Sequence, residues 1–120
     1  MHISRETTDP HSIQSYSDTQ ILVNQTSYQR SVLISKAAIM EWDIHGLKEL
    51  DLEHLAPIVA LQPEILLLGH NQLSVYPPMA ASTYLSKHRI GLESMSIGAA
   101  ARTFNVLLGE GRKVVLGIIF

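Results

Sequence analysis

The sequence predicts a single compact α/β domain in which strands and helices alternate and a β-hairpin lies near the N-terminal end. The chain has 120 residues, enough for one hydrophobic core but too few for two. Hydrophobic residues make up 46% and charged residues 17%, so the chain can bury enough apolar surface to offset the entropy lost on folding. From residue 64 onward, segments typical of strands alternate with segments typical of helices, the pattern of an α/β layer whose sheet the hairpin extends or flanks.

The first residues are polar. Residues 1–12 are rich in Ser, Thr, Asp and His, so we expect them to be mobile and the domain to span residues 13–120, with residues 13–19 loosely docked. This N-terminal stretch lacks the apolar core of a signal peptide, and its acidic residues argue against a transit peptide. The longest apolar run, residues 114–120, is far shorter than the roughly 20 residues of a membrane helix. The sequence therefore predicts a cytoplasmic protein without membrane insertion.

The first predicted elements are β-strands. Apolar, β-branched runs at residues 20–24 and 28–35 flank the polar stretch 24–27, which predicts a hairpin with a short loop. Residues 37–43 follow as another short strand. We expect Trp42, at the end of this strand, to anchor it on the core because a buried aromatic ring contributes a large apolar surface.

A short helix and a buried strand come next. Asp51 is an expected N-cap, and apolar residues recur at helical spacing over residues 52–59, with Pro57 in or just beyond the first turn. The continuous apolar run at residues 64–69 ends in Gly69. Such a run is typical of a strand that helices cover on both faces of a parallel sheet.

A second strand–helix alternation completes the chain. Prolines at residues 77–78 suit a helix entrance, so we expect a helix over residues 80–88 and a strand over residues 90–95. Ser96 is the expected N-cap of a helix over residues 97–108, which carries one apolar stripe.

The predicted last helix ends at the Gly-Glu-Gly turn, residues 109–111, and a buried strand follows over residues 113–120. So apolar a strand is prone to aggregate unless both its faces are covered. We therefore expect it to be central in the sheet or covered by a second subunit, which leaves a homo-oligomer open.

Charge and cysteine content exclude several kinds of function. The chain has 9 Lys and Arg against 11 Asp and Glu, a formal net charge of −2, and no basic cluster, so a nucleic-acid partner is not expected. The absence of Cys excludes disulfides, thiolate nucleophiles and cysteine-ligated metal centres. The six histidines lack the spacing of a metal-binding pair, and no G-x-S-x-G motif is present. No metal, cofactor or catalytic residue is therefore predicted.

The N-terminus of the helix over residues 97–108 is the candidate binding site. Its small residues leave amide groups and the positive end of the helix dipole open to an anion, which Arg102 is placed to contact. Loops at the carboxyl ends of two predicted strands would add polar groups. The candidate anion- or ligand-binding residues are Gly69, His70, Asn71, Ser96, Gly98, Ala99, Arg102 and Asn105. In the alternative interpretation the small residues pack the helix on the sheet, Arg102 pairs with an acid, and Asn105 satisfies backbone groups.

A further segment, residues 76–79, combines an aromatic residue, two prolines and a methionine. It is either a contact with an unknown protein partner or a stiff loop that enters a helix.

Three stretches, residues 63–69, 91–95 and 98–112 (GAAARTFNVLLGEGR), occur in the order found in a family of small uncharacterised α/β domains. The resemblance covers residues 13–120, and relatives in that family include a mitochondrial respiratory complex I assembly factor and an adipogenesis-associated domain protein. It implies a mixed β-sheet with helices packed on it, and it implies no reaction. The best-described members support the assembly of other proteins or act in poorly defined regulation.

Two departures from the family pattern bear on function. Members commonly carry G-T-G where this chain has Gly69-His70-Asn71, which removes a glycine that would let a ligand approach the backbone. Ala101 replaces a residue that is usually Cys, so no thiol-based role operates here. The resemblance thus predicts a non-enzymatic protein that interacts with other proteins or supports their assembly. Assembly of a respiratory complex is one form of this prediction. The alternative is an anion-binding domain or enzyme that uses residues 96–102.

Overall fold

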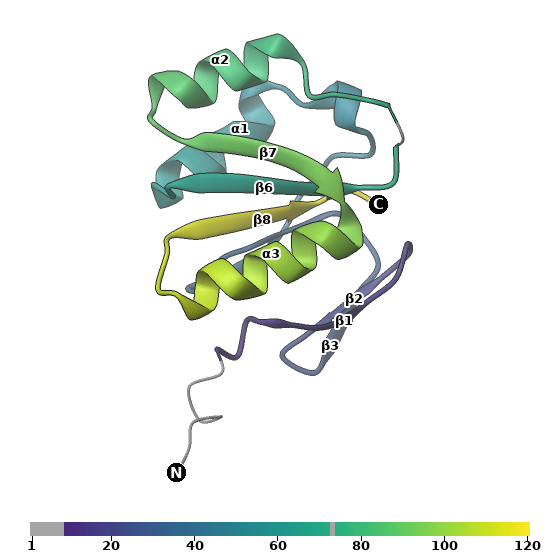
Figure 1. Ribbon diagram of the computed structural model, residues 1–120. Coiled ribbons are helices and arrows are strands. Elements are labelled where there is room, and N and C mark those ends of the chain that lie inside the picture. Colours follow the sequence, from purple (N-terminus) through teal and green to yellow (C-terminus); the bar gives the residue numbers. More distant parts are fainter. Residues whose placement is uncertain (1–8, 73) are drawn as a thin grey trace.

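The structure is a computed structural model that describes residues 9–72 and 74–120, and it confirms a compact α/β domain (Figure 1). Of the segment predicted to be mobile, residues 1–8 lie outside the described part. The elements in chain order are β1 (Ile13–Tyr16), β2 (Ile21–Val23), β3 (Thr26–Tyr28), β4 (Val32–Ile34), β5 (Ile39–Glu41), a 3₁₀ turn (Leu47–Glu49), α1 (Leu52–Leu61), β6 (Ile65–His70), α2 (Met79–Lys87), β7 (Gly91–Ser96), α3 (Ile97–Gly109) and β8 (Val114–Ile118).

The main sheet has five strands in the order β5-β4-β8-β6-β7. β6 runs parallel to both β7 and β8, whereas β4 pairs antiparallel with β8 and with β5, so the sheet is mixed. Helical crossovers link the three parallel strands, as chirality and chain length require of parallel neighbours. Every residue of β8 is buried, and its place between β4 and β6 confirms the predicted central strand.

Two hydrophobic cores lie on opposite faces of this sheet. One contains side chains of α1 and α2, and the other contains side chains of α3 and of the small sheet β1-β2-β3. In Figure 1, α3 lies between the main sheet and the small sheet. The predicted apolar stripe of α3 is confirmed, since Ile97, Ala100, Phe104 and Leu108 are all buried.

Trp42 is 5% exposed and anchors the end of β5 as predicted. Its ring lies against Gly117 of β8, where a Cβ atom would come within 2.6 Å of Trp42 Cζ3. The indole N–H donates to the carbonyl of His54 in α1 at 2.9 Å. The aromatic ring therefore fills the space that a glycine leaves in a buried strand, and its polar atom is satisfied.

The predicted hairpin exists, but its second strand, β3, spans residues 26–28 and so lies mostly in the stretch that was predicted as the loop, residues 24–27. β2 and β3 are joined by Asn24 and Gln25, whose φ values of 49° and 64° form the left-handed turn that matches strand twist. β3 ends at Tyr28, and β4 belongs to the other sheet. The single strand predicted over residues 28–35 is therefore wrong, because the chain changes sheets at residues 29–31.

The structure also contains a strand that the sequence did not predict. β1 lies within residues 13–19, which we expected to dock loosely, and it pairs antiparallel with β2. Only Ile13 of this strand is buried, so its sequence pattern carries no alternation that indicates a strand.

Helix α1 begins as predicted at Asp51, whose carboxylate accepts from the Leu52 N–H at 2.6 Å. His54 completes a capping box, since its Nδ1 accepts from the Asp51 N–H at 3.1 Å. The Nε2 atom of the same ring lies 3.1 Å from the Asp43 carbonyl, which ties the helix start to the segment after β5.

Candidate functional site

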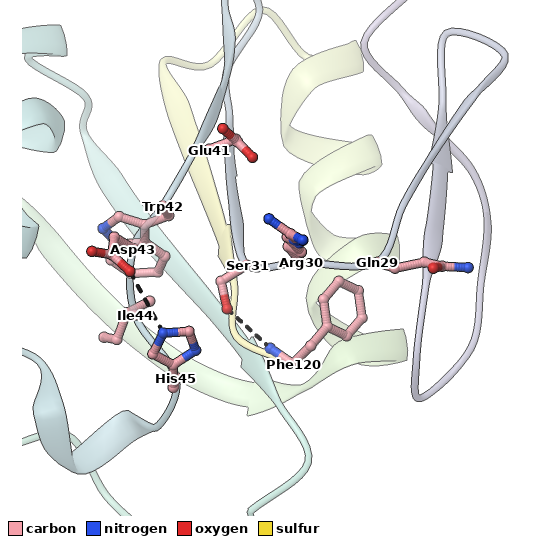
Figure 2. A pocket seen from close by; sticks show the side chains of 9 residues that line it. All are labelled: Gln29, Arg30, Ser31, Glu41, Trp42, Asp43, Ile44, His45 and Phe120. Atoms are coloured by element: carbon pink, nitrogen blue, oxygen red, sulfur yellow. Dashed lines mark hydrogen bonds and ion pairs between the residues drawn. The ribbon is translucent and has the colours of Figure 1, made fainter.

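A cavity of about 440 Å³ lies beside the segment that joins the two sheets, and Figure 2 shows its lining side chains. Ser31 Oγ accepts from the Phe120 N–H at 3.3 Å, and His45 Nε2 lies 3.5 Å from Asp43 Oδ1. Both side chains of the His45–Asp43 pair are mostly exposed, so water screens the interaction. Exposed charges of both signs surround this cavity, and no buried titratable group faces it among the side chains drawn in Figure 2.

A second, larger cavity lies at the carboxyl ends of β6 and β7 and is called here the strand-end cavity. Its volume is about 560 Å³. It is lined by Asp18, His70, Asn71, Gln72, Ser74, Val75, Tyr76, Ser94, Met95 and Ser96. Carboxyl ends of parallel strands are the usual place for ligands in α/β sheets. This cavity is the candidate site because it alone of the two contains a buried histidine.

His70 is 8% exposed at the end of β6. Its Nδ1 accepts a hydrogen bond from the Gln72 N–H at 3.1 Å, so the proton of the neutral ring resides on Nε2. Nε2 lies 2.8 Å from Ser94 Oγ and donates to it. Burial lowers the pKa of His70 because it disfavours the charged imidazolium. The ring is therefore neutral at pH 7, with one fixed tautomer.

The direction of the His70–Ser94 hydrogen bond decides what this pair can do. A serine nucleophile needs a histidine nitrogen that accepts its proton, as in Ser-His-Asp hydrolases. Here Nε2 already carries a proton and donates it toward Ser94, so the pair is not arranged to activate the hydroxyl. Because Ser94 Oγ accepts from His70, its own O–H is left to donate to another group, and Ser94 is one of the residues that line the cavity.

Three of the residues predicted for the site line the cavity, namely His70, Asn71 and Ser96. Asn71 Nδ2 donates to the carbonyl of Asp18 at 2.7 Å, which joins the loop after β6 to the loop after β1. Ser96 Oγ accepts from the Ala99 N–H at 3.2 Å and so caps α3. The amide of Ala99 is therefore used by the cap.

Arg102 and Gly98 lie outside the cavity, against β1. Arg102 Nη1 donates to the Tyr16 hydroxyl at 2.5 Å, and its guanidinium lies 5.9 Å from the centre of the Tyr16 ring. A Cβ atom on Gly98 would lie 2.8 Å from Tyr16 Cε1. The partner of Arg102 is thus a tyrosine, not the acid considered in the sequence analysis, and Gly98 provides space for that ring.

Gly69 and Asn105 have packing and backbone partners. A Cβ atom on Gly69 would come within 2.9 Å of Ala100 Cβ, so this glycine lets α3 approach β6 closely. Asn105 accepts from the Ile13 N–H at 2.7 Å and donates to the Ile13 carbonyl at 3.0 Å. Asn105 therefore satisfies backbone groups of β1, as the alternative interpretation predicts.

Sequence reasoning missed Ser94 and Gln72, which fix the state of His70. Ser94 alternates with Glu93 and Met95 in a predicted strand, which indicates a face but not which side chain lies across from it. That information depends on the pairing register of β6 with β7, where His70 aligns with Ser96 and Leu68 with Ser94. A sequence pattern without the register cannot place His70 diagonally across from Ser94.

The charge of the strand-end cavity differs from that expected of an anion site. Asp18 is the one charged side chain in its lining, and no Lys or Arg of residues 9–72 and 74–120 is part of it. In the same part of the chain, no three His, Asp or Glu side chains gather as a metal ion requires.

No helix of the described residues is both long and apolar enough to cross a membrane.

The fold and the cavity together define a small α/β domain with a mixed sheet and, at its strand ends, a cleft lined by both polar and apolar side chains. Its sequence matches, over residues 13–119, the family described as Protein of unknown function (DUF498/DUF598). The chain belongs to this family.

Three relatives illustrate the similarity. The chain is 26% identical to the "13 kDa major membrane protein" of Francisella tularensis subsp. holarctica (strain LVS), over 87% of this chain and 86% of that protein. The NMR structure of the Xanthomonas campestris protein XCC1710 is 31% identical, with a TM-score of 0.82 over 89% of this chain and 82% of that one. The crystal structure of an outer membrane protein from Bartonella henselae is 28% identical, with a TM-score of 0.82 over 93% and 96%.

Proposed function

We propose that this protein is a non-enzymatic interaction module that binds another protein through the loop between β6 and α2 and the first residue of α2. The observation that supports this proposal is the exposure of Tyr76 and Met79, which are 79% and 82% exposed. They are the most exposed large hydrophobic side chains of the described residues. Tyr76 also lines the strand-end cavity, so an apolar surface adjoins a recess with hydrogen-bonding groups.

The local backbone favours binding at this loop. Pro77 and Pro78 separate Tyr76 from Met79, and each proline fixes its own φ. A stiff segment loses little conformational entropy when a partner covers it, so more of the interaction energy contributes to affinity. Aromatic residues and methionine are enriched at protein interfaces for their large, adaptable contact area.

The names of two relatives support a partner at a membrane. One is called a major membrane protein and another an outer membrane protein. A domain can be held at a membrane by a membrane-bound partner, and this is the arrangement we propose. Support of the assembly of a membrane complex is the more specific form of the proposal. A respiratory complex is one such complex, and the only support for proposing it is the family resemblance.

The anion-binding alternative has less support. The strand-end cavity contains a carboxylate and no cationic side chain of the described residues, whereas Arg102 contacts Tyr16. The cytoplasmic location remains a prediction.

Photo-crosslinking in the native host tests the proposal. A photo-reactive amino acid replaces Tyr76 in the full chain, and a matched control replaces Val106, which is 59% exposed on α3. We expect position 76, but not position 106, to yield a crosslinked protein of defined mass in the membrane fraction. A chain that carries both Tyr76→Ser and Met79→Ser should be lost from the membrane fraction, in which the wild-type chain is retained. The proposal is overturned if position 76 crosslinks no protein, or if the purified chain sediments equally well with protein-free phospholipid vesicles.

A further inference from the structure

Strand β7 is a free edge of the main sheet. It pairs with β6 on one side, and no strand of the described residues lies on its other side. It has six residues, none of them fully buried, whereas β5 at the opposite edge has three. A long edge with unpaired backbone groups is a template on which another chain can add a strand.

The backbone direction of β7 shows which groups are free. The Gly91 N–H donates to the carbonyl of Glu64 at 2.9 Å, toward β6. Successive residues of a strand direct their backbone groups to opposite edges, so the N–H and C=O groups of Glu93 and Met95 also face β6. The N–H and C=O groups of Leu92 and Ser94 therefore face away from the sheet.

Ser94 connects this free edge to the strand-end cavity. Its side chain lines the cavity and its Oγ accepts a hydrogen bond from His70 Nε2–H, which leaves the Ser94 hydroxyl proton for another acceptor. The same residue directs its backbone N–H to the edge. Ser94 thus offers two donors close together, and Leu92 offers another N–H one strand repeat away. An occupant must supply oxygen acceptors at the spacing of a strand.

We infer that the partner in the proposed function binds as an extended peptide segment, which adds a strand to the free edge of β7. Carbonyl groups of the segment accept from the N–H groups of Leu92 and Ser94, as in other complexes formed by strand addition. One apolar side chain of the segment, opposite Ser94, enters the strand-end cavity beside Val75 and Tyr76.

Charge sets a second requirement on the segment. Glu93 is exposed on β7, and Asp18 lies at the cavity. Because side chains directly opposite each other on paired strands interact, a Lys or Arg opposite Glu93 would be favoured and an acidic residue disfavoured. The inferred partner segment is therefore extended, and basic and apolar residues alternate along it.

Amide hydrogen exchange on the full chain tests this inference, which rests on the proposed function. The probes are linear peptides from a random display library, selected on the wild-type chain and depleted on the Tyr76→Ser/Met79→Ser variant. In the free protein, the amides of Leu92 and Ser94 should exchange fast, and those of Glu93 and Met95 slowly. With a selected peptide bound, we expect exchange at Leu92 and Ser94 to slow by at least about tenfold. Glu93 and Met95 serve as internal references.

A pair of variants separates the backbone donor from the side chain. Ser94→Ala removes the hydroxyl but keeps the N–H, whereas Ser94→Pro removes both at an edge position where proline is tolerated. We expect Ser94→Pro to weaken peptide binding at least about tenfold more than Ser94→Ala, since it removes a ladder hydrogen bond. Slow exchange of the β6 amides in both variants verifies that they are folded.

Failure of this inference is distinguishable from failure of the proposed function. If position 76 crosslinks a protein but bound peptides leave exchange at Leu92 and Ser94 unchanged, strand addition is wrong and the interaction function stands. If no peptide is selected, or if β7 pairs with β7 of a second copy in light-scattering and exchange experiments, the assignment to a partner peptide is overturned.

Discussion

The side-chain amide of Asn105 holds both backbone groups of Ile13, accepting from its N–H at 2.7 Å and donating to its carbonyl at 3.0 Å. Asn105 lies in α3 and Ile13 begins β1, so one side chain closes a two-bond pairing of the kind that another strand would make. This contact fixes the small sheet on the helix that packs against the main sheet.

Substitution of Asn105 by Leu should therefore destabilise the fold. Two hydrogen bonds are lost and the backbone groups of Ile13, a residue 6% exposed, are left unpaired, so we expect a cost of about 1–3 kcal/mol. Urea unfolding followed by circular dichroism measures it. The neighbouring substitution Val106→Ala, at a side chain 59% exposed, is the control and should change stability by less than about 0.5 kcal/mol. Equal effects of the two would contradict the role given to Asn105.

Gly69→Ala should destabilise the protein through overpacking. The new methyl group would lie 2.8 Å from Ile118 Cδ1 and 2.9 Å from Ala100 Cβ, both in the core. Forcing these groups apart costs about 1–3 kcal/mol. Gly109→Ala is a matched control, because no atom lies within 4 Å of its added methyl group. It should be neutral or stabilise α3 by up to about 1 kcal/mol. A stable Gly69→Ala protein would show that α3 is not in close contact with β6.

Arg102→Ala should have a small effect on stability. Arg102 is exposed and its hydroxyl partner belongs to Tyr16, which is 42% exposed, so the pair contributes at most about 1 kcal/mol. The substitution Tyr16→Phe should give a similar change, and the double variant should cost less than the sum of the two. A thermal-melt cycle of the four proteins measures this coupling. Independent, additive effects would show that the contact contributes no energy.

Stability should fall in mild acid because of His70. Its folded-state pKa is lowered by burial, so between that value and the unfolded pKa of about 6.5 the unfolded chain binds more protons. The contribution is fully present above about pH 6.5 and is lost as the pH falls toward the folded pKa. Urea unfolding at neutral and mildly acidic pH should show a smaller loss in His70→Gln than in the wild type. Every other residue is the same in the two proteins, so its contribution to the pH dependence cancels in the difference. An identical pH dependence would contradict the assigned burial effect.

Long and strongly patterned segments were predictable from the sequence. The apolar runs of β6 and β8 and the stripe of α3 follow from burial alone, because a central strand and an amphipathic helix bury fixed sets of positions. The start of α1 was also predictable, since a carboxylate at an N-cap accepts backbone N–H groups in nearly any context.

Contacts between distant segments were not predictable. The change of sheet at residues 29–31 involves no Gly or Pro, so nothing in the local sequence separates β3 from β4. Tyr16 lies in a strand with one buried residue, and its position over Gly98 depends on how β1 packs on α3. For the same reason the sequence did not indicate that Arg102, which was expected to contact a ligand, instead contacts Tyr16. In contrast, His70, Asn71 and Ser96 line the same cavity.

The position of β8 has a consequence for the folding rate. β8 pairs with β4 through Val32↔Ile118 and with β6 through Ile65↔Val114, so it joins the two parts of the main sheet. Until this strand is in place, β4 and β5 have no hydrogen-bonded connection to β6 and β7. Pairing β4 with β8 closes a loop that contains all of the chain between these two strands. This closure costs chain entropy before any contact compensates for it, and folding slows as contacts become more distant in sequence. Formation of the β4–β8 pair should therefore limit the rate at which the whole sheet assembles.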